Sequence, residues 1–207
     1  MPLTAIAINC TLKRSSAEPS STDRMIGLLA DELRKHGVEV RDTIRIADHD
    51  IKPGVSSDEG DGDAWPDIRR RILDCDILIF GTPVWLGQMS SLAKRVLERM
   101  DAFLGETDDK GRMPSFGKVA VAGIVGNEDG AHAITADLFQ ALNDVGWTIP
   151  AAASDYWVGE AMQSKDFKDL PQVPDPVKQG AAMLGANAAH LANLLQQQPY
   201  PGVPQSS

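Results

Sequence analysis

The stretch ILIFGTPVWLGQMSSLAKRVLERMD, Ile77–Asp101, joins a continuous apolar run to an amphipathic segment through a loop rich in glycine and serine. An uninterrupted apolar run is typical of a central strand that is buried on both faces of a parallel sheet. From Ser90 to Phe103, apolar residues recur at helical spacing, which predicts a helix with one buried face. The stretch therefore predicts a strand, a loop and a helix, which is the repeating unit of a parallel α/β sheet.

The same alternation continues through the rest of the chain. We predict strands at Leu3–Asn9, Val38–Ile46, Ile77–Phe80, Val119–Val125 and Trp147–Ala153. We predict helices at Asp23–His36, Pro66–Asp74, Ser90–Phe103, Ala131–Val145 and Val177–Leu195. Five strands that alternate with helices indicate a parallel sheet with helices on both faces, which is a three-layer α/β sandwich.

Length and composition indicate one globular domain. The chain has 207 residues, and we predict a single domain over residues 1–197 and a disordered tail over residues 198–207. No apolar run approaches the roughly 20 residues that cross a bilayer, and Leu3–Ile8 is too short for a secretory signal. Cys10 and Cys75 form neither a metal-ligand pattern nor a disulfide framework. We therefore expect a cytoplasmic protein without a membrane segment or a metal site.

The charge of the chain restricts its partners. The formal net charge is −9, and binding to nucleic acid requires a basic surface. Lys13 and Arg14 nevertheless lie together in the loop after the first strand, beside few acidic residues. A locally basic loop on an acidic protein indicates a small anionic ligand rather than a polyanion.

Ligands of open parallel sheets bind at the carboxyl ends of the strands. The loop after the first strand, NCTLKRSSAEPSSTDRM (Asn9–Met25), leads into the N-terminus of a helix, where free N–H groups bind phosphate. It contains neither a Gly-Lys-Ser/Thr sequence nor a G-x-G-x-x-G fingerprint. The alternative is a solvated loop in which Ser21 or Thr22 only caps the helix. The candidate phosphate ligands are Thr11, Lys13, Ser20, Ser21 and Thr22.

The loop after the third strand offers an aromatic side chain beside several backbone amides. A flat heteroaromatic ligand requires such an apolar wall with hydrogen-bond donors at its edge. The alternative is that Trp85 is a core or interface residue. The candidate ligand-binding residues are Thr82, Pro83, Val84, Trp85, Leu86, Gly87 and Gln88.

The loop after the fourth strand, GNEDGAHA (Gly126–Ala133), has two glycines that permit close approach of the backbone to a ligand. The alternative is a plain turn in which Asp129 caps the next helix. The candidate residues are Gly126, Asn127, Glu128, Asp129 and Gly130. Together the three loops provide a phosphate site, an aromatic wall and a close-approach loop, a combination that fits flavin mononucleotide (FMN).

The chain resembles the flavodoxin-like NAD(P)H-dependent FMN reductases, a family that includes quinone reductases and iron–sulfur flavoproteins. The resemblance covers about residues 3–160 and is most specific in GTPVWLGQMSSLAKRVLERMD, Gly81–Asp101. It implies a five-stranded parallel sheet in the order 2-1-3-4-5. It also implies that the first loop binds the FMN phosphate and that the isoalloxazine ring lies between Trp85 and the 126–131 loop. Backbone amides around Trp85–Gln88 would then meet the polar edge of the ring. The compact cysteine cluster of the iron–sulfur branch is missing, so no such cluster is expected.

The resemblance further implies an enzyme that passes hydride from NAD(P)H through bound FMN to a quinone, a flavin or another small acceptor. Such chemistry requires no catalytic side chain from the protein. Two alternatives are an electron carrier of the flavodoxin type and a flavin-free binding module. The aromatic residues Trp65, Tyr156 and Trp157 suggest a homo-oligomer, either a dimer or a tetramer.

Overall fold

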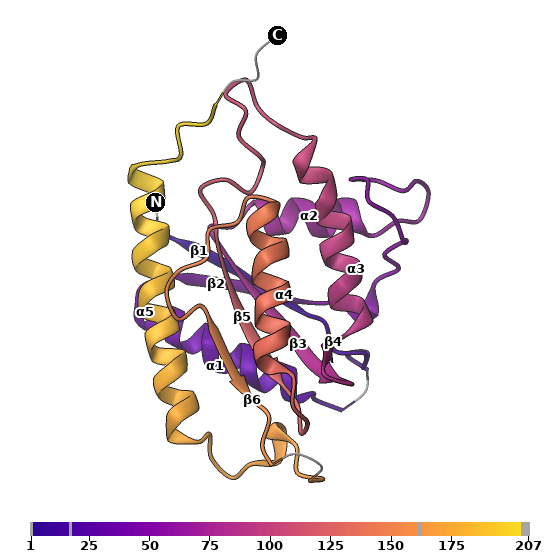
Figure 1. Cartoon of the computed structure of the whole chain (residues 1–207), viewed down its shortest axis with the longest axis vertical. Coiled ribbons are helices and arrows are strands. Elements are labelled where there is room, and N and C mark those ends of the chain that lie inside the picture. The colour runs from indigo at the N-terminus through magenta and orange to yellow at the C-terminus, as the bar shows by residue number, and fades with distance from the viewer. Residues whose placement is uncertain (1, 17, 161–162, 204–207) are drawn as a thin grey trace.

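The structure is a computed structural model that describes residues 2–16, 18–160 and 163–203 (Figure 1). Its sheet has five parallel strands in the order β2-β1-β3-β5-β6, and a short strand, β4, pairs antiparallel with β3. Counted along the parallel strands alone, this is the predicted order 2-1-3-4-5, which is confirmed. The strands are β1 (Thr4–Asn9), β2 (Glu39–Arg45), β3 (Ile77–Trp85), β4 (Gln88–Met89), β5 (Val119–Val125) and β6 (Ser154–Trp157).

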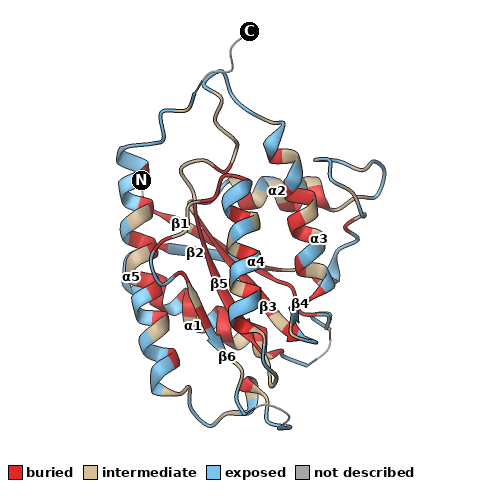
Figure 2. Ribbon diagram, viewed as in Figure 1, coloured by how far each residue is buried: buried red, intermediate tan, exposed pale blue. Residues whose placement is uncertain are grey.

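Helices cover both faces of the sheet, as the alternation of strands and helices predicts. Ile77 and Ile79 of β3 pack into a cluster with α1 and α5, whereas Leu78 and Phe80 pack into a second cluster with α2, α3 and α4. Figure 2 shows the buried sheet and the buried inner sides of the helices around it. The helices are α1 (Ser21–Lys35), α2 (Trp65–Leu73), α3 (Ser91–Met100), α4 (Ala131–Asp144) and α5 (Asp175–Gln197).

The fifth strand lies later in the chain than the sequence predicts. The prediction placed it at Trp147–Ala153, but β6 spans Ser154–Trp157. Within Trp147–Ala153, the bridge between Thr148 and Val119 is isolated, and Ala122 N donates to the Ala153 carbonyl at 2.8 Å immediately before β6. Pro150 has no N–H to donate to a strand, and the chain then turns through Ala152, whose φ is 55°. Trp147 is buried whereas Ala151 and Ala152 are exposed, so this segment packs beside the sheet before the strand begins.

The C-terminal segment returns to the amino end of the sheet. Tyr200 lies edge-on to Phe116 with 5.7 Å between ring centroids, and its hydroxyl accepts a hydrogen bond from Thr148 Oγ1 at 3.1 Å. Of the tail for which we predict disorder, residues 204–207 lie outside the described part of the chain. Among the described helices, none combines the length and apolarity that a bilayer crossing requires.

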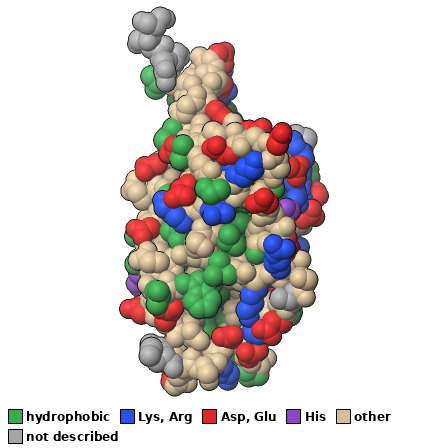
Figure 3. All heavy atoms as spheres, turned by 90° about the vertical axis from the view of Figure 1, so that its right-hand side faces the viewer, with side chains coloured by type: hydrophobic (Ala, Val, Ile, Leu, Met, Phe, Trp, Pro, Cys, Tyr) green, Lys and Arg blue, Asp and Glu red, His purple; other side chains and the backbone are tan. Residues whose placement is uncertain are grey.

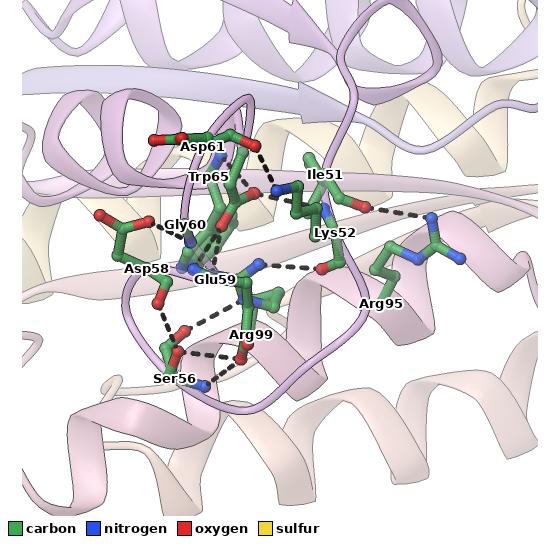
Figure 4. Close-up of polar contacts among 11 residues, drawn as sticks. Ile51, Lys52, Ser56, Asp58, Glu59, Gly60, Asp61, Trp65, Arg95 and Arg99 are labelled. Atoms are coloured by element: carbon green, nitrogen blue, oxygen red, sulfur yellow. Dashed lines mark hydrogen bonds and ion pairs between the residues drawn. The ribbon is translucent and has the colours of Figure 1, made fainter.

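The segment between β2 and α2 is organised around Arg99 of α3 (Figure 4). Arg99 donates from Nη1 to the Lys52 carbonyl at 2.8 Å and from Nε to the Ser56 carbonyl at 3.1 Å. Its Nη2 lies 2.7 Å from Asp63 Oδ2, and the side chains of both residues are fully buried. The guanidinium also lies 5.9 Å from the Trp65 ring centroid. The Arg99 guanidinium therefore holds the long polar segment between β2 and α2 against the α2–α3 side of the molecule.

The buried carboxylate of Asp63 also has several hydrogen-bond donors besides Arg99. Its carboxylate accepts backbone N–H bonds from Lys52 at 3.2 Å, Glu59 at 3.0 Å and Trp65 at 3.1 Å. Burial alone would raise the pKa of Asp63, but the Arg99 bond and these amides lower it to about 2. The carboxylate therefore stays ionised at neutral pH and down to about pH 2.

Replacing Arg99 with Ala is expected to destabilise the protein by about 3–5 kcal/mol, because it leaves the Asp63 carboxylate buried without its counter-ion. Urea unfolding of the wild type and the variant measures the difference. The control is Arg95→Ala, which removes one hydrogen bond to the Ile51 carbonyl at 3.1 Å and should cost about 1 kcal/mol. Equal losses in the two variants would contradict the role given to Arg99.

Candidate functional site

A cavity of about 220 Å³ lies where the carboxyl ends of β1, β3 and β5 meet the N-terminus of α1. It combines hydroxyl groups from the first loop, apolar surface from β3 and backbone from the loop after β5. Its lining residues are Thr11, Lys13, Ser20, Ser21, Thr22, Pro83, Val84, Trp85, Val125, Gly126, Asn127, Asp166 and Phe167.

Ser20 is the N-cap of α1. Its Oγ accepts from the Asp23 N–H at 3.1 Å, and Asp23 in return accepts from the Ser20 N–H at 2.8 Å, which forms a capping box. The sequence left Ser21 and Thr22 as possible caps, and the structure assigns that position to Ser20 instead. The first N–H groups of a helix have no intrahelical acceptor, so those of Ser21 and Thr22 remain available to an anion.

Asp23 also joins the helix to the ends of two strands. Its Oδ1 accepts from Asn9 Nδ2 at 2.6 Å, and its Oδ2 pairs with Arg45 at the end of β2. Burial alone would raise the pKa of Asp23, but hydrogen bonds from Ser20 and Arg45 lower it. The start of α1 is thereby fixed relative to β1 and β2, which places its N–H groups at the cavity.

Phe167 and Asp166 line the cavity although nothing in the sequence singled them out. Arg24 of α1 donates from Nη1 to the carbonyls of Phe167 at 2.7 Å, Lys168 at 3.2 Å and Leu170 at 2.7 Å. Ser21 Oγ accepts from the Lys168 N–H at 3.2 Å. The available signal was an arginine in the first turn of a helix. Its acceptors lie more than 140 positions away, too far for a local pattern to indicate them.

The two basic residues of the first loop have different positions. Lys13 lines the cavity, where its Nζ pairs with Glu18 at 2.8 Å, and Lys168 reaches the same carboxylate at 3.2 Å. Arg14 is exposed and does not line the cavity. Of the two alternatives, Lys13 is thus the residue that lies next to the candidate phosphate site.

The second loop is a β-hairpin rather than an open loop. β3 continues to Trp85, and Leu86 and Gly87, with φ of 52° and 75°, form the two-residue turn into β4. Trp85 is 53% exposed and Leu86 92% exposed. Figure 3 shows hydrophobic side chains gathered on the side of the molecule that carries α3 and the hairpin. The tip of the hairpin therefore presents apolar surface at the mouth of the cavity.

The third loop packs closely against this hairpin at two of its glycines. A Cβ added at Gly126 would lie 2.8 Å from Val84 Cβ, and one at Gly130 would lie 2.7 Å from Gly87 Cα. Between these two contacts, Glu128 accepts hydrogen bonds from the N–H groups of Leu86 at 3.0 Å and Gly87 at 3.3 Å. The glycines are therefore required because the two loops pack closely together. From the sequence alone, we attributed them to close approach of the backbone to a ligand.

The structure divides the predicted site residues into two groups. Those at the cavity are Thr11, Lys13, Ser20, Ser21, Thr22, Pro83, Val84, Trp85, Gly126 and Asn127. Those outside its lining are Thr82, Leu86, Gly87, Gln88, Glu128, Asp129 and Gly130. Thr82, for example, is fully buried and accepts from the Ser90 N–H at 3.2 Å. The second group builds and braces the hairpin and the loop beside the cavity.

Cys10 does not add a nucleophile to the site. The side chain is fully buried, and burial raises the pKa of its thiol. The thiol therefore stays protonated at neutral pH and packs as a small apolar group. Among the described residues, no group of three or more His, Cys, Asp or Glu side chains is arranged to hold a metal ion.

Asp155 of β6 lies behind the aromatic side of the cavity. Trp157, two residues later, contacts Phe167 with 5.5 Å between ring centroids. Asp155 is 6% exposed, its Oδ2 has no hydrogen-bond partner among the described residues, and a Cβ added at Gly180 of α5 would lie 2.6 Å from its Oδ1. Burial raises the pKa of Asp155 to about 6. In the folded protein this carboxyl group is therefore protonated below about pH 6 and ionised at neutral pH.

Comparisons with known proteins agree with this geometry. The sequence model of the NADPH-dependent FMN reductases matches residues 4–162. The 8-demethyl-8-aminoriboflavin-5'-phosphate synthase of Streptomyces davaonensis is 30% identical over 97% of this chain and 81% of its own length. A crystal structure of RosB with bound 8-demethyl-8-formylriboflavin-5'-phosphate is 30% identical, with a TM-score of 0.85 over 96% of this chain and 82% of that one.

Three further similarities are narrower in what they show. A Mycobacterium bovis protein named divalent metal cation transporter MntH is 37% identical over 94% of this chain, but the chain spans only 29% of that protein's length. An apo structure of an NADH:FMN oxidoreductase is 19% identical, with a TM-score of 0.62 over 97% of this chain and 95% of that one. A flavodoxin from an archaeon shares 13% identity and a TM-score of 0.56, covering 92% of this chain and 99% of its own. These last two show that the fold is flavodoxin-like.

Asp155 predicts a specific dependence of stability on pH. The pKa of Asp155 is higher in the folded than in the unfolded chain. Its ionisation therefore lowers the free energy of unfolding as the pH rises from about 4 through about 6. Asp155→Asn should therefore stabilise the protein relative to wild type by roughly 2–3 kcal/mol more at pH 8 than at pH 4. Urea unfolding at the two pH values measures this, and a difference that does not change with pH would contradict it.

Proposed function

Because the chain belongs to the NADPH-dependent FMN reductase family, we propose that it is an FMN-dependent oxidoreductase that passes reducing equivalents from NAD(P)H to a quinone, a free flavin or another small acceptor. FMN is the cofactor of this family, and NAD(P)H is its reductant. The observation that carries the proposal is the cavity itself, which has helix N–H groups and hydroxyls at one end and an exposed tryptophan at the other.

The donor set of the cavity fits a flavin phosphate. The N–H groups of Ser21 and Thr22 and the hydroxyls of Thr11 and Thr22 would hold the phosphate, with Lys13 supplying positive charge. The hydroxyl groups of Ser20 and Ser21 are less available to a phosphate, because their oxygens already accept hydrogen bonds from the N–H groups of Asp23 and Lys168. Trp85 and Phe167 offer apolar surfaces for the ring, and Asn127 adds a polar group beside it.

Bound FMN would supply the two-electron chemistry, and the chain would supply position and electrostatics. The capped helix fixes the phosphate end, and the hairpin fixes the wall for the ring. Because Trp85 is half exposed at the cavity mouth, a second flat substrate can approach from this side. No nucleophilic side chain is needed for this reaction, which agrees with the buried, protonated Cys10.

A second candidate function is chemical modification of the flavin itself. The relative with 30% identity is named as a synthase of an aminoriboflavin phosphate, and the corresponding structure has a TM-score of 0.85, against 0.62 for the NADH:FMN oxidoreductase. In that case the same cavity would bind a flavin phosphate as substrate rather than as a resident cofactor. The two functions share a binding site and differ in the fate of the flavin ring.

We also propose that the protein is a cytoplasmic homo-oligomer. Of the aromatic residues on which that expectation was based, Trp65 does not support it. Trp65 is fully buried beneath Arg99 and is not available to a partner. Tyr156 is 37% exposed, and Leu86 at the hairpin tip is 92% exposed. The apolar surface that favours self-association is therefore at the edge of the cavity rather than near α2.

The first test is the visible spectrum of the purified protein during anaerobic addition of NADH or NADPH. We expect a yellow protein, or a colourless one that becomes yellow with FMN, whose absorbance near 450 nm (about that of free flavins) is bleached by NAD(P)H with the recovered flavin unchanged in mass. Flavin of altered mass after turnover would favour the synthase function, and a yellow protein that neither nucleotide bleaches would favour an electron carrier. A protein that cannot take up FMN would contradict all flavin functions.

The second test concerns the phosphate end of the cavity. Replacing both Ser21 and Thr22 with Ala should weaken FMN binding at least about tenfold, or about 1.4 kcal/mol, because both side chains lie at the proposed phosphate site. Riboflavin, which has no phosphate, should bind both proteins equally, and Ser16→Ala, at an exposed position outside the cavity, is the control. Quenching of flavin fluorescence gives the affinities, and unchanged FMN affinity would place the phosphate elsewhere.

A further inference from the structure

We propose that Glu128 is an internal competitor of the flavin ring, which holds the hairpin amides in the flavin-free protein and must leave them when the ring binds. This inference rests on the proposed binding of a flavin in the cavity. It assigns to Glu128 a role in setting flavin affinity that differs from direct contact with the ligand.

The contacts of Glu128 are directed at two consecutive N–H groups. Oε1 accepts from Leu86 N at 3.0 Å, and Oε2 accepts from Gly87 N at 3.3 Å, so each carboxylate oxygen has one donor. Both donors belong to the two-residue turn, whose residues have positive φ and no strand partner for these groups. A carboxylate is a strong acceptor, and hydrogen bonds to a charged group exceed neutral ones in strength.

The loop geometry holds the backbone of Glu128 close to the hairpin. Gly126 and Gly130 on either side of it contact the hairpin so closely that a Cβ at either position would clash. The neighbouring Asp129 turns the other way, since its Oδ1 accepts from its own loop at Gly130 N, 2.7 Å away. Of the two adjacent carboxylates, only Glu128 is directed at the hairpin.

The amides that Glu128 occupies belong to Leu86 and Gly87, which lie outside the cavity lining but follow directly after Trp85, which is part of it. The pyrimidine edge of a flavin carries carbonyl oxygens, and these require N–H donors once the ring is placed against Trp85. An N–H group makes one good hydrogen bond, so it cannot donate to the carboxylate and to the ring at the same time. The Glu128 side chain is half-buried and has access to solvent, so it can return to water when displaced.

Competition has a consequence that a structural brace would not have. If Glu128 only held the hairpin in shape, removing it would loosen the wall of the cavity and weaken flavin binding. If it competes, removing it frees the two donors and tightens binding. The effect concerns the ring alone, because Glu128 is on the hairpin side of the cavity and the phosphate ligands are on α1.

The experiment compares Glu128→Ala, Glu128→Gln and the control Asp129→Asn, which removes the same charge from the same loop without touching the hairpin amides. We expect Glu128→Ala to bind FMN and riboflavin on the order of tenfold more tightly than wild type, by equal factors for the two ligands. Glu128→Gln should show a smaller gain, since its amide oxygen still accepts one bond, and Asp129→Asn should show none. In the flavin-free protein, hydrogen exchange at Leu86 N and Gly87 N should be faster in Glu128→Ala than in wild type.

The possible results distinguish failure of the competitor role of Glu128 from failure of the proposed flavin function. Flavin binding that is weakened or unchanged in Glu128→Ala overturns the competitor role and leaves the proposed function standing. Equal gains in Asp129→Asn also overturn it, because they would show a general effect of charge. Failure of all variants, Glu128→Ala included, to bind either flavin contradicts the proposed function and this inference with it.

Discussion

The carboxylate of Asp23 is the contact on which the site depends. It accepts from the side chain of Asn9 at the end of β1, pairs with Arg45 at the end of β2, and completes the capping box with Ser20. Three separate segments therefore meet at one ionised group. Without it, the N-terminus of α1 would have no fixed position relative to the sheet, and its free N–H groups would not point into a shared cavity. The next turn of α1 extends this arrangement, since Arg24 holds the segment that brings Phe167 to the cavity.

The opposite side of the cavity is built on a different principle. There Gly130 packs against the backbone of Gly87, Gly126 packs against the side chain of Val84, and among the described residues no ion pair joins the hairpin to the loop after β5. Close packing leaves little room for adjustment, while the hairpin tip itself stays exposed. The proposed phosphate end is thus fixed by a part-buried polar network, and the proposed ring end combines a closely packed base with an exposed tip. This asymmetry suits a ligand whose phosphate stays in place while a second substrate reaches its ring.

Arg99 and Asp63 show how the same chain stabilises a region remote from the cavity. The excursion between β2 and α2 has few apolar residues, so it cannot be held by hydrophobic burial alone. A fully buried ion pair that also satisfies backbone carbonyls and amides replaces the missing core. Such a pair is costly to desolvate, and it is tolerated because nearly every polar atom in it has a partner. The sequence showed an acidic, glycine-rich loop and gave no sign of the arginine on α3 that organises it.

Local patterns were sufficient for the order of strands and helices and for the three loops of the site. Apolar runs identified β1, β3 and β5, and helical spacing identified α1, α3 and α4, because these signals depend on neighbours in the sequence. The fifth strand was misplaced because an apolar run such as Trp147–Ala153 can pack beside the sheet, with an isolated bridge to it, before the strand begins. The hydroxyl groups at the start of α1 and the exposed Trp85 were also evident from their positions after strands.

What the sequence determined by itself was thus the alternation of elements, the parallel sheet and the edge at which a ligand binds. Only the tertiary structure decided which loop residues line the cavity, that Phe167 joins them, and that Glu128 holds the hairpin amides. The reason is physical. A strand or helix is specified by contacts between residues a few positions apart, whereas the bonds of Arg24, Glu128 and Arg99 join residues more than 35 positions apart. Such partners become neighbours only after the sheet has formed.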